Sequence, residues 1–276
     1  MGSCYSRKNK VSTTSLDEEE KKKEIKKKKN IYILYGASGS GKDTQCRLLE
    51  KKYNYKIICM SKLLKEYKEE YNKENVSNEE GNYSDEIEKC MIDGSLVNDK
   101  IVIEIFHKQL NKYINDDKYN GIIINGFPRN YEQALLIKQN NISITKFINI
   151  QVGKDTLWRR INNRIIDPIT NISYNENIIQ LIKKKREGQE LSDEEQKQLI
   201  IDNQIYNNLS NDILERLTKR KDDEEQVFNK RFQLYIESEQ KINSLFKNIC
   251  KSVDGEKSIN HIFDQICSII DDDNPN

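Results

Sequence analysis

The sequence predicts an α/β fold in which a parallel sheet is covered by helices on both faces. Short apolar runs alternate with amphipathic helical segments along most of the chain, which is typical of such sheets. A Gly-rich loop joins the first apolar run, residues 31–35, to the helix that follows it. Residues 165–219 lack the alternation and indicate an inserted subdomain. In such folds, ligands bind at the carboxyl ends of the strands.

Composition limits the classes of function. The chain has 276 residues, enough for one large domain or two small ones. Its net charge is only +1, so no overall field favours a nucleic-acid partner, and we expect none. No run of 18 apolar residues occurs, so the sequence predicts no transmembrane helix.

The first predicted element is a phosphate-binding loop. Residues 31–35 form an apolar strand, and the loop from Gly36 to Lys42 has the pattern G-x-x-x-x-G-K. The glycines let backbone N–H groups turn toward an anion, while the helix N-terminus and Lys42 add positive charge. A plain Gly/Ser surface loop does not require the strand, the lysine and the helix together. The pattern therefore predicts binding of a nucleoside triphosphate.

The remaining elements follow in order along the chain. Residues 61–93 have a helical pattern with a polar interruption near 75–82, and Ser192 and Glu195 form a capping-box signal. Further strands are predicted at residues 56–59, 121–125, 146–152 and 251–254. Further helices are predicted at residues 45–51, 99–113, 154–164, 224–246 and 258–270, and one more begins at about residue 131.

Arginines flank the predicted insertion on both sides. Arg160 and Arg164 lie before it and are four residues apart, so they share one helix face. Arg220 and Arg231 follow it, and Arg129 lies at a strand end. A single arginine is usually a surface residue, but this placement predicts a lid that brings positive charge onto a transferring phosphoryl group.

The N-terminal thirty residues form a polar tail that we expect to be disordered. Its start fits the N-myristoylation pattern, with Gly2 exposed after removal of Met1 and Ser6 at the required position. Cys4 is a candidate for palmitoylation, and the lysine-rich run at residues 21–29 is a second membrane signal. The alternative is an unmodified, solvated tail. The pattern predicts a protein made in the cytosol and held on a membrane surface by lipid.

The six cysteines indicate neither a disulfide framework nor a metal cluster. They form no C-x-x-C pair, and most have apolar neighbours in the sequence. Free, buried thiols in a reducing compartment are the favoured interpretation.

At this point the chain resembles the adenylate kinase family in its long-lid form, over about residues 31–270. The loop at residues 36–45 is similar to G-x-P-G-x-G-K-G-T-Q, and Gly126-Phe-Pro-Arg129 is the most distinctive signature. The arginines around the insertion match the pattern that opens and closes the family's lid. Residues 167–174 resemble the first lid strands, and residues 253–257 resemble the segment beside the ATP adenine.

The resemblance implies a domain organisation. It implies a five-stranded sheet in the order 2-3-1-4-5, flanked by helices. The core comprises residues 31–60, 98–160 and 220–270, with a monophosphate-binding insertion at 61–97 and a lid at 161–219. Residues 1–30 and 271–276 are tails. The lid contains no cysteine, so we expect no zinc in it.

The resemblance also implies the reaction: reversible phosphoryl transfer from ATP to AMP with Mg²⁺, in a monomer whose lid closes. Lys42 would contact the β- and γ-phosphates, Arg129 the AMP phosphate, and Arg231 the transferring group. Arg160, Arg164 and Arg220 would clamp ATP. The implied ATP site comprises Gly36, Ala37, Ser38, Gly39, Ser40, Gly41, Lys42, Asp43, Thr44, Arg160, Arg164 and Lys257. The implied AMP site comprises Met60, Lys65, Ser95, Val97, Gly126, Arg129 and Gln133.

Several positions depart from the family pattern. Asn125 replaces an aspartate that supports Mg²⁺, while Asp43 replaces a glycine. One hypothesis is that Asp43 supplies the missing carboxylate and holds Mg²⁺ through water. The alternative is that Asp43 is only a favourable helix-start residue. Met60 and Lys65 replace a threonine and an arginine, and lysine lacks the planar fork of arginine, so we expect weaker AMP binding or another monophosphate. Gln133 favours adenine.

Two other functions stay open. The chain could be a kinase for another nucleoside monophosphate, or one that uses GTP as donor. It could instead be a lipid-anchored nucleotide-binding scaffold with weak activity. The residues that differ from the family pattern, Met60, Lys65 and Asn125, leave this alternative open.

Overall fold

The computed structural model describes residues 29–74, 83–201, 206 and 209–272. At its centre lies a five-stranded sheet in which every neighbouring pair is parallel, in the order β2-β3-β1-β4-β7. Its strands are β1 (Asn30–Tyr35), β2 (Tyr55–Cys59), β3 (Gly121–Asn125), β4 (Lys146–Gln151) and β7 (Cys250–Asp254). Because β7 is the fifth strand of this sheet along the chain, the predicted order 2-3-1-4-5 is confirmed.

The central strand β1 is buried on both faces. Successive side chains point to opposite sides of a strand, so Ile33 packs into one hydrophobic cluster and Tyr32 and Leu34 into another. One cluster contains side chains of α3, α4, α5, α6 and α12, and the other contains side chains of α2 and α13. Burial on both faces explains why β1 and β3 read as continuous apolar runs.

The helices of the core lie close to where the sequence predicted them. They are α2 (Lys42–Tyr53), α5 (Asp99–Ile114), α6 (Tyr131–Gln139), α7 (Lys154–Asn162), α12 (Glu225–Leu245) and α13 (Ile259–Asp271). Several begin at side-chain caps. The Ser258 hydroxyl accepts from the backbone N–H of His261 at 3.3 Å. The side-chain Oδ1 atom of Asn130 accepts from the backbone N–H of Gln133 at 2.8 Å.

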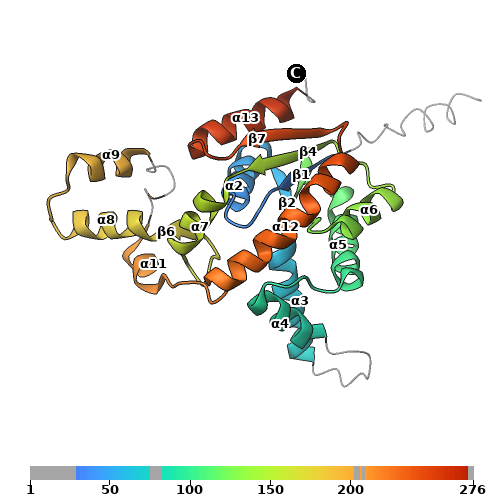
Figure 1. The fold of residues 1–276 in the computed structure, drawn as a ribbon, viewed down its shortest axis with the longest axis horizontal. Helices are drawn as coiled ribbons and strands as arrows, with labels where there is room; N and C mark the ends of the chain where they lie inside the picture. Colours follow the sequence, from blue (N-terminus) through green and yellow to red (C-terminus); the bar gives the residue numbers. More distant parts are fainter. Residues whose placement is uncertain (1–28, 75–82, 202–205, 207–208, 273–276) are drawn as a thin grey trace, which may run out of the picture.

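Two insertions project from the core (Figure 1). The first comprises α3 (Met60–Glu74) and α4 (Tyr83–Asp93), between β2 and α5. The second, which we call the lid, follows α7. It comprises β5 (Arg164–Ile166), β6 (Ser173–Asn175), α8 (Glu176–Arg186), α9 (Asp193–Ile201) and α11 (Asn211–Arg216). Both insertions begin at the carboxyl end of the sheet, where ligands bind in this class of fold.

The lid is stabilised by its own small core and by one buried ion pair. Ile165, Tyr174 and Leu214 belong to a hydrophobic cluster that is separate from those of the sheet. Asp167 is fully buried and accepts two hydrogen bonds of 2.7 Å from Arg216, which ties the β5–β6 hairpin to α11. Desolvation opposes this pair, but the bidentate contact with Arg216 holds the pKa of Asp167 well below its usual range.

The predicted capping box begins α9. The Ser192 hydroxyl accepts from the backbone N–H of Glu195 at 3.3 Å, and the Glu195 carboxylate accepts from that of Ser192 at 2.9 Å. Across the residues that the structure describes, no three His, Cys, Asp or Glu side chains gather into a metal cluster.

Some expectations concern residues outside the described part of the chain. Gly2 and Cys4 lie there, as do the interruption at residues 75–82 and most of the C-terminal tail. None of the helices in the described ranges has the length and apolar character needed to cross a bilayer. All five described cysteines are free, as predicted, but only Cys46 and Cys267 are buried. The prediction of burial is wrong for the others, because Cys90 and Cys250 pack only at the edge of a core cluster and Cys59 ends β2 outside the clusters.

Candidate active site

A cavity of about 780 Å³ lies at the carboxyl ends of β1, β2 and β3. It is lined by the loop after β1, the start of α3, the end of α4, the segment after β3, the lid hairpin, α12 and the start of α13. Six cationic residues predicted from separated stretches all line this cavity: Lys42, Arg129, Arg160, Arg164, Arg220 and Arg231. The fold therefore brings these charges to one place.

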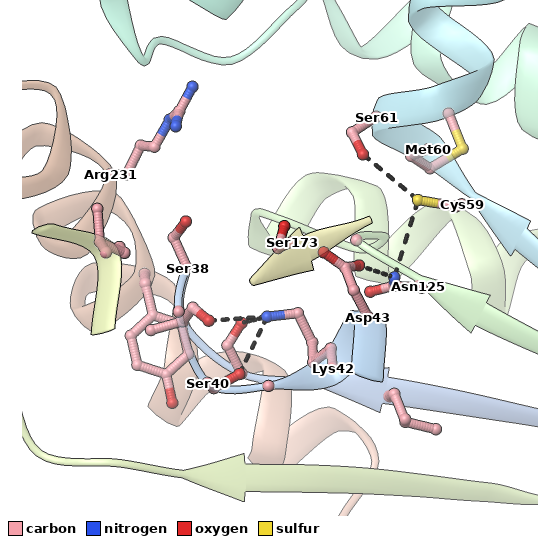
Figure 2. A pocket seen from close by; sticks show the side chains of 18 of the residues that line it. Ser38, Ser40, Lys42, Asp43, Cys59, Met60, Ser61, Asn125, Ser173 and Arg231 are labelled. Carbon is pink, nitrogen blue, oxygen red and sulfur yellow. Dashed lines mark hydrogen bonds between the residues drawn. The ribbon is translucent and has the colours of Figure 1, made fainter. Parts of the chain in front are cut away.

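The loop after β1 wraps around the ammonium group of Lys42. The Lys42 Nζ donates to the carbonyl oxygens of Gly36 and Ala37 at 2.7 Å each and to the Ser40 hydroxyl at 3.1 Å (Figure 2). Gly36 has a φ of +145°, and a Cβ there would lie 2.6 Å from the Ile150 carbonyl oxygen, so only glycine fits this turn. The lysine thus lies in the hollow that its own loop forms.

The environment of Lys42 makes its charge dependent on pH near neutrality. Removal from water lowers the pKa of Lys42 to about 8, and the positive charges of Arg129 and Arg164 also lower it, while Asp43 partly opposes the shift. A phosphate bound beside the ammonium group would favour its charged form and raise this pKa.

Proton uptake on ATP binding is therefore expected near pH 8. About half of the Lys42 side chains are neutral at that pH and would take up a proton when ATP binds, whereas almost all are already charged at pH 6. Affinity should be fully present below pH 8 and fall as the pH rises above it. Calorimetry with ATP alone, in buffers of different ionisation enthalpy, measures the uptake. Lys42→Arg, which stays charged, should show none; equal uptake by both proteins would contradict the assignment.

Two neighbouring aspartates, Asp222 and Asp223, hold the arginines of the lid base and α12. Arg164 makes a bidentate contact with Asp223. Arg220 donates to Asp222 at 2.9 and 2.5 Å, and Arg231 donates to Asp222 at 2.8 Å. Although removal from water acts to raise the pKa of Asp222, the Arg220 contact lowers it well below its usual range.

Sequence reasoning did not single out these two aspartates as site residues. They follow Arg220 closely in the sequence, at positions 222 and 223, and that closeness to a predicted site residue was the available signal. Because both carboxylates accept hydrogen bonds from these guanidinium groups, they fix the guanidinium groups in place. The arginines are therefore positioned before any anion binds.

Arg129 and Gln133 are joined after β3. The backbone N–H of Arg129 donates to Gln133 Oε1 at 2.8 Å, and Gln133 Nε2 donates to Asp99 at 2.7 Å. The Gln133 side chain lines the cavity, but it is buried and both ends of its amide are engaged. The Arg129 guanidinium is open to the cavity, where partial removal from water and the charge of Arg231 lower its pKa.

The implied AMP residues divide into two groups. Met60, Ser95, Val97 and Gly126 line the cavity, whereas Lys65 is exposed and does not. Lys65 comes one residue after the buried Leu64, and successive helical residues are about 100° apart, so it faces solvent while Leu64 faces the cavity. In this structure Lys65 is therefore not brought together with the other predicted residues, and Ser61 occupies the cavity wall instead.

The implied ATP residues are all brought to the same cavity. Residues 36–44, Arg160, Arg164 and Lys257 all line the cavity. Arg160 donates to the Gly255 carbonyl oxygen at 2.8 Å, which links α7 to the segment after β7. Lys257 forms an exposed ion pair with Asp254 at 3.6 Å. Lys257 is thus the one residue of the segment at 253–257, which resembles the part of the family beside the ATP adenine, that lines the cavity.

Asp43 and Asn125 are in direct contact at the cavity floor. Asn125 Nδ2 donates to Asp43 Oδ1 at 2.5 Å and lies 3.8 Å from Cys59 Sγ (Figure 2). Removal from water acts to raise the pKa of Asp43. The hydrogen bond from Asn125 and the positive charge of Lys42 outweigh this effect and lower the pKa below its ordinary value. In the described residues, no lysine or arginine approaches Asp43 within 4.0 Å in an ion pair. The low pKa of Asp43 therefore does not depend on an ion pair with a lysine or arginine of the described residues.

A parallel sheet with a phosphate-binding loop, a lid and converging arginines defines a P-loop phosphotransferase. A family model described as Adenylate kinase matches residues 34–251. The chain is 94% identical to "Adenylate kinase 2" of Plasmodium falciparum (isolate 3D7) over 276 residues, which are 100% of both chains. The chain therefore belongs to the adenylate kinase family.

More distant relatives extend the comparison. A "GTP:AMP phosphotransferase" of the same organism is 32% identical over 222 residues, covering 78% of this chain and 84% of the relative. An "Adenylate kinase" of Giardia intestinalis is 27% identical over 228 residues, covering 82% of this chain and 75% of the relative. One of these relatives is thus named for GTP as its phosphate donor.

Proposed function

We propose that this chain transfers the γ-phosphoryl group of ATP reversibly to AMP, giving two ADP. The observation that carries the proposal is the convergence of Lys42 and five arginines on one cavity at the carboxyl ends of the strands. The 94% identity to a protein named as an adenylate kinase supports the same substrates. The cavity volume of about 780 Å³ supports ligands of substantial size.

In this mechanism the attacking group is an oxygen of the AMP phosphate, which is already ionised, so no general base is required. Catalysis is then mainly alignment and charge neutralisation. Lys42 would contact the β- and γ-phosphates, Arg129 would hold the AMP phosphate, and Arg231 would lie nearest the transferring group. Arg160, Arg164 and Arg220 would close over ATP with the lid, and closure would exclude water.

Mg²⁺ is the metal that the family implies, and the residues of this cavity fit it. Hard oxygen ligands suit Mg²⁺, and the Asp43 carboxylate is ionised, open to the cavity and adjacent to the amide that replaces the family's acid. We assign Asp43 to hold the ion through water. The metal would supply charge neutralisation on the phosphates.

Exchanging the residues at positions 43 and 125 tests this assignment. Asp43→Gly should raise the Mg²⁺ concentration for half-maximal turnover about tenfold, because the nearby carboxylate is lost. Adding Asn125→Asp should restore most of the Mg²⁺ affinity, because it places a carboxylate at position 125, next to the position where the carboxylate was removed. The measurement is a Mg²⁺ titration of initial rates. An unchanged Mg²⁺ requirement in Asp43→Gly would show that the residue only begins the helix.

A coupled assay decides the substrates. AMP, CMP, UMP and GMP are each tested against ATP and GTP with the purified chain. The proposal expects turnover to be highest with AMP and ATP. Turnover with another monophosphate, or with GTP as the preferred donor, would favour the kinase alternatives. GTP is included in the assay because one relative is named a GTP:AMP phosphotransferase. ATP binding without turnover for any pair would favour a nucleotide-binding scaffold.

We also propose that the enzyme is a monomer held at a membrane surface by lipid. The sequence at Gly2 and Ser6 fits N-myristoylation, Cys4 is available for palmitoylation, and the lysine run adds electrostatic attraction. A single myristoyl chain binds only marginally, with a constant of about 10⁴ M⁻¹, so a second signal is needed for stable attachment.

Gly2→Ala should abolish membrane attachment. Coexpression with an N-myristoyltransferase should add one myristoyl group to the wild-type chain, seen as a mass increase, and the product should float with vesicles that contain anionic lipid. Gly2→Ala should do neither, whereas Ser3→Ala should retain both because position 3 is variable in the pattern. An unmodified wild-type chain would contradict the assignment.

A further inference from the structure

The edge of the sheet opposite the cavity carries lysines that the proposed reaction does not use. Because all five strands are parallel, their amino ends lie at this edge, while the cavity lies at carboxyl ends. β1 begins at Asn30, β2 at Tyr55 and β3 at Gly121, and the pairing of these strands aligns the three residues. Four lysines gather beside these strand ends: Lys29, Lys56, Lys112 and Lys118.

Two tyrosine rings hold these lysines together. Tyr113 lies in the last turn of α5 and Tyr119 in the loop before β3, with ring centroids 5.9 Å apart in an edge-on contact. The Lys56 Nζ atom lies 4.6 Å from the ring centroid of Tyr113 and 5.3 Å from that of Tyr119. Lys112 Nζ lies 5.3 Å from the centroid of Tyr113, and Lys118 Nζ lies 5.6 Å from that of Tyr119. We call the four lysines and two tyrosines the lysine–tyrosine patch.

Lys29 connects the patch with the N-terminal tail. Its Nζ atom donates to the carbonyl oxygen of Tyr113 at 3.0 Å and to that of Asp116. Lys29 is also the last residue of the lysine-rich run at residues 21–29 and the first residue that the structure describes. The positive charge of the folded surface therefore continues directly into the charged part of the tail.

We propose that the lysine–tyrosine patch is the face with which the protein contacts an anionic membrane, an inference that rests on the proposed lipid attachment. Its four lysines and the two aspartates of the same loop, Asp116 and Asp117, leave a charge of +2. Ring faces and carbonyl oxygens stabilise an ammonium group but carry no net negative charge, so the patch attracts anionic headgroups. Lys112 and Lys118 are exposed.

The tyrosines suit the same surface. Both rings are half-buried, and a tyrosine with an apolar ring and a polar hydroxyl is well matched to the boundary between lipid and water. The whole chain has a net charge of only +1, so the attraction is confined to this edge and the tail rather than spread over the molecule. This distribution favours a membrane with a fixed orientation of the protein.

Contact through this patch would leave the active site accessible. β1 has six residues and so spans about 17 Å between the two edges of the sheet. The cavity lies at the far edge, so it would open away from the bilayer. The lid and the first insertion begin at that far edge as well, so nucleotides could enter and the lid could close without displacing lipid.

Binding of the myristoylated full chain to vesicles tests the orientation. On vesicles that contain phosphatidylserine, Lys112→Gln with Lys118→Gln should lower partitioning about 25-fold, because each lysine near an anionic leaflet contributes about fivefold. Lys185→Gln with Lys197→Gln is the matched control, since both lysines are exposed on lid helices and the change in charge is the same. The control should stay within about twofold of the wild type, and equal losses in both double variants would overturn the proposal.

A second measurement uses the wild-type sequence and so does not depend on how the variants fold. Lysine acetylation is followed by peptide mass spectrometry with and without the vesicles. Protection of Lys112 and Lys118 with continued labelling of Lys185 and Lys197 is the expected result, and equal labelling of Lys112 and Lys118 under both conditions would refute the contact. Protection by single-stranded RNA instead of vesicles would assign the patch to nucleic acid and also overturn the proposal.

The mass of the whole protein separates the two proposals. A chain that carries the myristoyl group and binds the vesicles, but leaves Lys112 and Lys118 open to acetylation, would retain the lipid attachment and refute only the orientation. A chain that gains no myristoyl group would contradict both. Neither readout requires turnover, so the outcome is independent of the proposed reaction.

Discussion

Lys42→Met is expected to lower kcat/KM by about 10²–10³-fold, which is typical of removing one fixed charge that stabilises a transition state. The side chain now bonds to three oxygens of its own loop and would exchange these for phosphate oxygens. Methionine has a similar length but neither donates nor carries charge. Initial rates with ATP and AMP measure the loss.

Lys51→Met is the control for that variant. Lys51 lies in the last turn of the same helix and is exposed, so the substitution should leave the rate within about twofold while changing the net charge equally. If Lys42→Met kept the wild-type rate while remaining folded by circular dichroism, the loop would not be the triphosphate site.

Arg231→Ala should be comparably damaging, with kcat reduced by about 10²-fold or more, because this guanidinium is assigned to the transferring group. Arg231 donates to Asp222 and to the Met91 carbonyl oxygen of α4 at 2.9 Å, so it links α12 with the first insertion. The loss should appear mainly in kcat rather than KM if the contact is made in the transition state.

The adjacent residue provides a matched comparison. Lys230 also lies on α12, but it forms an exposed ion pair with Asp93 at 3.2 Å. Surface pairs of this kind contribute about 0–1 kcal/mol, so Lys230→Ala should leave kcat nearly unchanged. If both variants lost activity equally, the effect would come from α12 as a whole and not from the guanidinium in the cavity.

The strands and core helices could be predicted closely because their signals are local. The apolar run of β1, the glycines after it and the amphipathic α2 are consecutive, so strand, turn and helix follow from neighbouring residues. The order of the strands came from family resemblance, and the parallel pairings confirm it. The capping box at Ser192 was equally local and is present.

The parts that could not be predicted depend on contacts between distant residues. The exposure of Lys65 depends on which face of α3 packs against the cavity, and the motif match alone did not fix that face. The pairing of Arg164 with Asp223 joins the two sides of the lid across 59 residues. Such contacts are selected by packing and by the desolvation of charges, which a linear pattern does not contain.

By itself, the sequence determined that this protein has a strand–loop–helix for phosphate and arginines on both sides of an insertion, because each motif is built from adjacent residues. Only the tertiary structure decided that Asp43 contacts Asn125, which is 82 residues away, and that Cys59 faces the same amide. The physical reason is the register of the parallel sheet, which aligns the carboxyl ends of β1, β2 and β3 and so collects side chains that the chain itself keeps apart.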